Sequence, residues 1–190
     1  MNNCYIMRTN KFNIKGDKMK KRWFIYAIVG IVFGVFDFYY QRVIQGLNLS
    51  GMYTIILCYG IWLVPLLPIA LYESKVSLSS RKASIASVLT WSTSIISYYM
   101  FLAIELMFIG RESRIEMHIS NYADPYFWSN WKSVFYGQVV AGIIEWIVVA
   151  IVGGFIIGYL VNFTYIKLKM KKTLTADDET LKEDNIIGKV

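Results

Sequence analysis

The sequence predicts an all-α membrane protein in which four transmembrane helices form a small bundle with both termini in the cytoplasm. The chain of 190 residues is 56% hydrophobic and 17% charged, with a mean hydropathy of +0.43, whereas soluble domains carry roughly a quarter charged residues. Its apolar residues form four long blocks, and its basic residues gather in alternate connections between them. This distribution excludes a soluble globular enzyme, a disordered chain and a disulfide-stapled secreted domain.

The four apolar blocks are long enough to cross a bilayer, because a spanning helix needs about 20 apolar residues. They are continuous and lack alternating polarity, which favours helices over barrel strands. We expect a basic N-terminal arm at 1–22, a transmembrane domain at 23–166 and a polar cytoplasmic tail at 167–190. The expected spans are 23–40, 53–72, 83–110 and 139–163.

The placement of Lys and Arg predicts the orientation of the spans. The first 22 residues hold seven basic side chains and one Asp. Other basic residues lie in the second connection and at the start of the tail: Lys75, Arg81, Lys82, Lys167, Lys169, Lys171 and Lys172. The positive-inside bias therefore places both termini and the second connection on the cytoplasmic side of the cell membrane. That orientation requires an even number of spans, which agrees with the four found from hydropathy.

The first 18 residues fit poorly with the segment that follows them. Met19 to Trp23 reads as a short basic stretch leading into an apolar run, which is typical of the start of a bacterial membrane protein. We hypothesise that translation begins at Met19 and that 1–18 is a gene-model extension. The alternative is a disordered basic arm, and N-terminal mass analysis of the native protein distinguishes the two.

The connection at 111–137 is rich in aromatic residues, which favours the headgroup layer over water. They are Tyr122, Tyr126, Phe127, Trp128, Trp131, Phe135 and Tyr136. We expect an aromatic belt or a short interfacial helix here, with a turn or helix start at Asp124-Pro125. A lid over an outward-facing cavity is the alternative. The acidic tail after Lys172 is expected to be disordered, with a frayed helix as the alternative.

Three carboxylates interrupt the apolar spans: Asp37, Glu105 and Glu145. Acidic residues within a span are costly and commonly face the bundle interior or water, so each is a candidate functional residue. Antiparallel threading brings all three within about two helical turns of the outer surface, at about 1.5 Å per residue. We hypothesise that they line an outward-opening cavity and, with Gln41 and Tyr98, bind a cation or a basic solute.

A structural interpretation of the same carboxylates remains open. Each acid then lies close enough to the headgroups to reach water, or pairs with Arg42 or Arg111. Single replacements of the three acids by Asn or Gln test the cation-binding hypothesis, because the cluster is incidental if all three variants keep full activity and stability.

Helix periodicity predicts which faces of the spans pack closely. Gly30 and Gly34 share a face with Asp37, and such glycines allow close helix approach. Gly154 and Gly158 lie roughly opposite Glu145 and form a second packing face, either for a neighbouring helix or for a second subunit.

The second span contains two prolines, which bend a helix and free backbone carbonyls. The two prolines are Pro65 and Pro68. With Cys58, Tyr59 and Trp62, this span is expected to line the same cavity.

No catalytic motif is present in the sequence. It contains no zinc-protease or phosphate-loop pattern, and no His or Lys lies within a span to activate the serines of the third block. The single His118 and the separated Cys4 and Cys58 do not indicate a metal site. We therefore expect no enzyme activity and no cofactor. No nucleic-acid partner is expected either, because a basic soluble domain is lacking.

Two function classes remain for a multi-pass protein of this kind. The first is a carrier for a cation or basic solute, or the membrane subunit of a transporter, that uses the outer-leaflet carboxylates. The second is a non-transporting assembly, regulatory or immunity protein that acts by helix–helix contact with a partner. In both classes the surroundings are the lipid bilayer, and the partner is a second copy or a larger membrane complex.

Overall fold

The computed structural model describes residues 3–47, 50–108 and 123–187, with side chains described at 19–47, 50–108 and 123–171. Its elements are α1 (Asn3–Gly46), α2 (Gly51–Gly60), α3 (Leu63–Ser77), α4 (Ser80–Phe108), α5 (Phe127–Val134), the π-helical η2 (Phe135–Val140) and α6 (Ala141–Ile187). Every element of these ranges is helical, which confirms the predicted all-α class.

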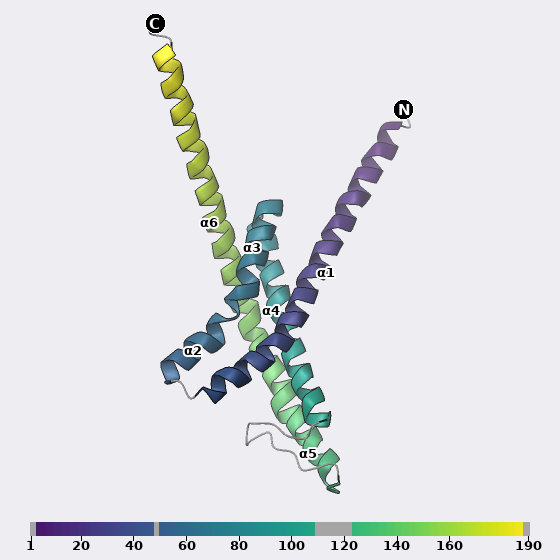
Figure 1. Ribbon diagram of the computed structural model, residues 1–190. Helices are drawn as coiled ribbons and strands as arrows, with labels where there is room; N and C mark the ends of the chain where they lie inside the picture. The colour runs from purple at the N-terminus through teal and green to yellow at the C-terminus, as the bar shows by residue number, and fades with distance from the viewer. Residues whose placement is uncertain (1–2, 48–49, 109–122, 188–190) are drawn as a thin grey trace.

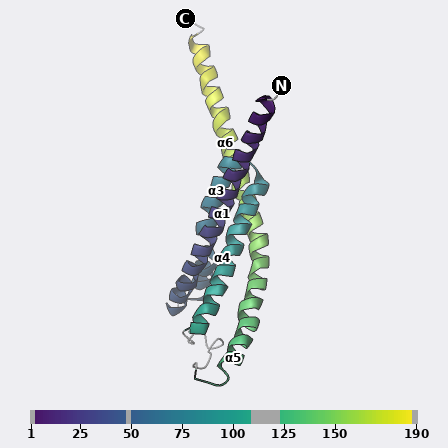
Figure 2. The same ribbon diagram turned by 90° about the vertical axis from the view of Figure 1, so that its right-hand side faces the viewer.

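Four helical segments are long and apolar enough to cross a membrane, as the sequence predicted. They are Met19–Gly46, Gly51–Ser77, Ser80–Phe108 and Phe127–Lys171. Helix α1 begins and α6 ends at the same end of the bundle, which we name the terminal end; α5 lies at the opposite end, named the α5 end (Figures 1 and 2). This arrangement fits a multi-pass membrane protein with an even number of crossings.

The second span is broken into α2 and α3 instead of running straight through 53–72. The break lies at Ile61 and Trp62, between the two helices. Pro65 explains its position, because its ring clashes with the carbonyl four residues earlier and it has no N–H to donate. The Ile61 carbonyl instead accepts from the Val64 N–H at 3.0 Å. As a result α2 turns away from the direction of α3, as Figure 1 shows.

The helical segment that contains the fourth span begins at Phe127, well before the predicted Val139. Asp124 and Pro125 form a turn in which the Asp124 carboxylate accepts the Tyr126 N–H at 2.8 Å, and α5 starts at Phe127. From there α5, η2 and α6 follow one another without a loop. The expected short helix is present as α5, but it continues directly into the fourth span, whereas 111–122 lie outside the described residues.

Both ends of the chain are more helical than the sequence suggested. Helix α1 extends back to Asn3, and α6 continues to Ile187, so the predicted disorder of the tail is wrong over most of its length. The tail from Lys167 to Ile187 contains five Lys and three Leu and no Gly or Pro. These residues favour a helix once the preceding span has nucleated it.

Helix α4 lies at the centre and packs against α1, α3 and α6. Gly30 and Gly34 bring α1 against the α4 backbone, and Gly154 and Gly158 do the same for α6. Both glycine faces thus meet a neighbouring helix within the same chain, which is one of the two predicted possibilities. Small residues of this kind allow close backbone approach in membrane bundles.

The buried apolar side chains form three layers along the bundle. Near the terminal end the layer contains Tyr26, Ile69 and Ala86; the middle layer contains Phe33, Trp62, Ile95 and Ala150; and the layer near the α5 end contains Phe38, Tyr98, Leu102, Ala103, Leu106, Phe127 and Val139. Phe127 is 1% exposed in the last layer. This aromatic residue of the 111–137 connection therefore belongs to the core, while Tyr126, Trp128 and Tyr136 are exposed.

A methyl group added at Gly158 is expected to lower the free energy of unfolding by about 1–3 kcal/mol. Its Cβ would lie 2.5 Å from the Ser84 Cα and 2.6 Å from the Ala83 carbonyl, so α4 and α6 must separate. Unfolding of Gly158→Ala in detergent measures the effect. Gly60→Ala is the matched control, because nothing lies within 4 Å of that Cβ; equal behaviour of the two variants would contradict the prediction.

Candidate functional site

A cavity of about 500 Å³ lies between α1, α2, α4 and α6. Its lining extends from the exposed Gln45, next to the end of α1, to Trp62 and Ile95 in the middle core layer. The lining residues are Asp37, Gln41, Gln45, Thr54, Ile55, Cys58, Tyr59, Trp62, Ile95, Tyr98, Tyr99 and Trp146. The volume is within the roughly 300–1,000 Å³ that is typical of small-molecule sites.

The cavity exists because α2 does not close against the bundle. None of the α2 side chains is buried, whereas α3, after the break, buries Pro65, Leu66 and Ile69. The proline-induced break therefore separates a packed half of the second span from a half that leaves space beside α1 and α4. Three side chains of this span, Cys58, Tyr59 and Trp62, line the cavity as the sequence predicted.

Asp37 is the carboxylate of this cavity, and it is fully buried. The Gln41 side-chain amide, one turn later on α1, donates to Asp37 Oδ2 at 3.0 Å. The other carboxylate oxygen, Oδ1, has no hydrogen-bond partner in the part of the chain that the structure describes. None of the lining residues is Lys, Arg or His. Asp37 thus lines the cavity with one carboxylate oxygen hydrogen-bonded and with the other buried and unpartnered among the described residues.

Glu105 lies outside the cavity, in an ion pair with Arg42. The two Arg42 amino groups donate to its two carboxylate oxygens at 2.7 and 2.6 Å. The Arg42 guanidinium also lies over the Phe38 ring, 4.8 Å from its centroid. This bidentate pair joins α1 to α4, and it matches the structural alternative that the sequence left open for Glu105.

Glu145 is exposed on α6 and does not line the cavity, although its neighbour Trp146 does. Gly154 lies nine residues further on, which is half a turn around the helix at 3.6 residues per turn. Since the glycine face of α6 packs against α4, the Glu145 face is directed away from it. Of the three predicted carboxylates, only Asp37 lines this cavity, whereas Glu105 pairs with Arg42 and Glu145 is exposed.

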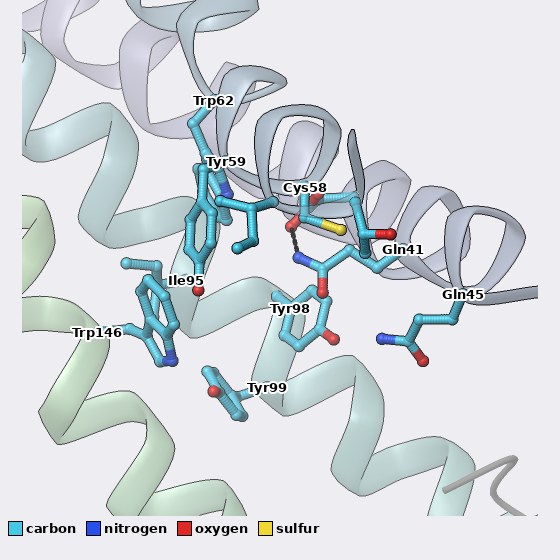
Figure 3. Close-up of a pocket in the computed structure, with 12 residues that line it drawn as sticks. Gln41, Gln45, Cys58, Tyr59, Trp62, Ile95, Tyr98, Tyr99 and Trp146 are labelled. Atoms are coloured by element: carbon cyan, nitrogen blue, oxygen red, sulfur yellow. Dashed lines mark hydrogen bonds between the residues drawn. The ribbon is translucent and has the colours of Figure 1, made fainter. Parts of the chain in front are cut away.

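Gln41 and Tyr98, the two uncharged residues of the predicted site, both line the cavity together with Asp37. In Figure 3, Tyr59, Tyr99 and Trp146 lie on one side of the space, and Gln41 and Gln45 on the other. Sequence reasoning missed Tyr99 and Trp146. An aromatic residue in an apolar span resembles a lipid-facing side chain, so no local signal distinguished them.

Sequence reasoning also missed that a third carboxylate, Glu73, is buried. It is fully buried near the terminal end and accepts from Tyr26 Oη at 2.7 Å and from Arg22 at 3.1 Å. It follows the span expected at 53–72 and so falls in the predicted second connection. Its spacing from Leu66 and Ile69, seven and four residues earlier, places it on their buried face and was a usable signal.

The described residues contain no group of three or more His, Cys, Asp or Glu side chains suited to hold a metal ion. No protein-family model, curated protein or solved structure matches the chain. The function proposed below therefore rests on the geometry of the site.

Proposed function

We propose that this chain is a multi-pass membrane protein that binds a cation in the cavity beside Asp37, as a carrier or as the membrane subunit of a transporter. The observation that supports it most directly is the buried Asp37 carboxylate with one unpartnered oxygen at the wall of a cavity. Burying a carboxylate is costly unless a positive charge or hydrogen bonds compensate it. A bound cation supplies that compensation.

The other two buried carboxylates differ from Asp37, because each of them pairs with an arginine of the same chain. Glu73 has Arg22 as its cation and Glu105 has Arg42, at 3.1 and 2.6 Å. Among the described side chains, Asp37 has a single neutral donor, Gln41, and no ion pair. The chain thus provides internal cations for two acids and leaves the third facing a space large enough for a solute.

The cavity has one exposed and one buried end, which suits a binding site reached from one side. Gln45 and Thr54, beside the α1–α2 connection, lie at the exposed end, and Trp62 closes the buried end. In the orientation that the basic residues favour, the exposed end faces the outside. We therefore propose that the solute enters from the outer side of the membrane.

Cation binding is tested by thermal stabilisation of the full chain in lipid nanodiscs, followed by tryptophan fluorescence. The probes are the chlorides of sodium, potassium, magnesium, manganese and tetraethylammonium. A ligand that binds the folded state is expected to raise the melting temperature by about 5 °C at about 100 times its Kd. We expect such a shift with at least one probe, and its loss in Asp37→Asn.

Glu145→Gln is the matched control, because it also removes one carboxylate but lies outside the cavity. We expect this variant to keep the full cation-induced shift. If no probe stabilises the wild-type chain, or if Asp37→Asn responds as the wild type does, the cation-binding function is wrong. The non-transporting assembly or regulatory class then becomes the better interpretation.

A further inference from the structure

The aromatic wall of the cavity indicates which class of cation it accepts. Five of its lining residues carry aromatic rings: Tyr59, Trp62, Tyr98, Tyr99 and Trp146. They come from the second span, α4 and α6, and they share the cavity with a single carboxylate. Rings of Trp and Tyr attract a cation placed over their faces, most strongly where water is excluded.

Two ring pairs form the sides of this wall. Tyr59 of α2 and Trp146 of α6 are stacked, with centroids 5.6 Å apart and an interplanar angle of 29°. Tyr98 and Tyr99 of α4 meet edge to face at 5.1 Å. Figure 3 shows Tyr59, Trp146 and Tyr99 gathered beside one space. The two pairs bring rings from three segments to the same cavity as Asp37.

The remaining polar groups of the cavity are poorly suited to an inorganic divalent ion. Calcium takes six to eight oxygen ligands and magnesium needs near-octahedral geometry, each commonly with several carboxylates or waters. Asp37 is the only carboxylate in the lining, and Gln41, Gln45 and Thr54 are neutral. One negative charge among aromatic rings matches a single positive charge on an apolar body.

We propose that the ligand of this cavity is a monovalent organic ammonium, with its charge near Asp37 and its alkyl groups against the aromatic wall. This inference rests on the proposed cation-binding function and deepens it. The buried end, formed by Trp62 and Ile95, offers apolar surface to the alkyl groups. Asp37 carries the only carboxylate in the lining, and the Gln41 amide is its one hydrogen-bond donor among the described residues.

Tetraethylammonium binding to the full chain in nanodiscs tests the proposal, with potassium and magnesium as inorganic probes at matched ionic strength. Tyr59→Leu is the main variant, because the Tyr59 side chain is 52% exposed and its loss leaves the buried layers intact. We expect it to weaken tetraethylammonium binding about tenfold. Trp146→Leu is expected to act in the same direction, and Trp146→Phe to retain more affinity than Trp146→Leu.

Trp128→Leu is the matched aromatic control, since Trp128 is 53% exposed on α5 and outside the cavity. It is expected to bind tetraethylammonium as the wild type does. If an inorganic cation binds through Asp37 and tetraethylammonium does not, or if Tyr59→Leu and Trp146→Leu leave its affinity unchanged, the inference is wrong while the cation-binding function stands. If no cation binds, both are wrong.

Discussion

Replacing Arg22 with methionine is expected to lower the free energy of unfolding by about 3–5 kcal/mol, because it leaves the Glu73 carboxylate buried without a cation. Glu73 is fully buried, and Arg22 and Tyr26 are its two hydrogen-bond donors in the described chain. The pair joins α1 to α3 next to the apolar layer at the terminal end. Denaturant unfolding of the full chain in mild detergent measures the loss.

Three further variants separate the ion pair from other effects of the change. Lys21→Met removes the same charge from an exposed neighbour and is expected to change little. Tyr26→Phe removes one neutral donor and is expected to cost about 1 kcal/mol. The double variant Arg22→Met/Glu73→Leu removes both charges and is expected to recover most of the lost stability. Equal stability of Arg22→Met and Lys21→Met would contradict the assigned pair.

The burial of Asp37 shows what the sequence predicts well. Gly30 and Gly34 lie seven and three residues before it, on one side of the same helix, so the glycine face and the acid face coincide. Once small residues bring that face against α4, Asp37 is buried with it. Helix periodicity and hydropathy are local properties, and a single sequence contains both.

The separation of the other acids shows where such reasoning stops. Depth in the membrane follows from position along a span, and the three carboxylates were matched on depth alone. Whether Glu145 meets the others depends on the rotation of α6 about its axis, which its packing on α4 sets. The Arg42–Glu105 pair joins residues 63 positions apart and depends on α1 and α4 being neighbours. Neither relation has a local sequence signal.

The aromatic wall depends on tertiary structure in the same way. Trp146 reaches the cavity from α6 and stacks against Tyr59 of α2, a contact between segments far apart in the sequence. The sequence placed Tyr59 beside a cavity through the neighbouring prolines, but it offered no reason to select Trp146 among six tryptophans. A ligand class based on stacked rings could therefore be inferred only from the structure.

Replacing Arg42 with methionine is expected to lower the free energy of unfolding by about 2–3 kcal/mol. The substitution leaves Glu105, whose side chain is 8% exposed, without its bidentate partner. The reciprocal change, Glu105→Gln, is expected to cost less, because the Arg42 side chain is 29% exposed and its guanidinium can be solvated. Unfolding of both variants and of Arg42→Met/Glu105→Leu gives the coupling energy of the pair.

Arg42→Lys provides a second control, since it keeps the charge but loses the two-pronged geometry, and it is expected to be intermediate. Because the pair lies outside the cavity lining, Arg42→Met should keep the tetraethylammonium-induced rise in melting temperature from its lower starting value. Equal losses for Arg42→Met and Glu105→Gln would contradict the asymmetry derived from their exposure. Loss of the tetraethylammonium response in Arg42→Met would instead mean that the Arg42–Glu105 pair shapes the cavity, and that Asp37 does not act independently of it.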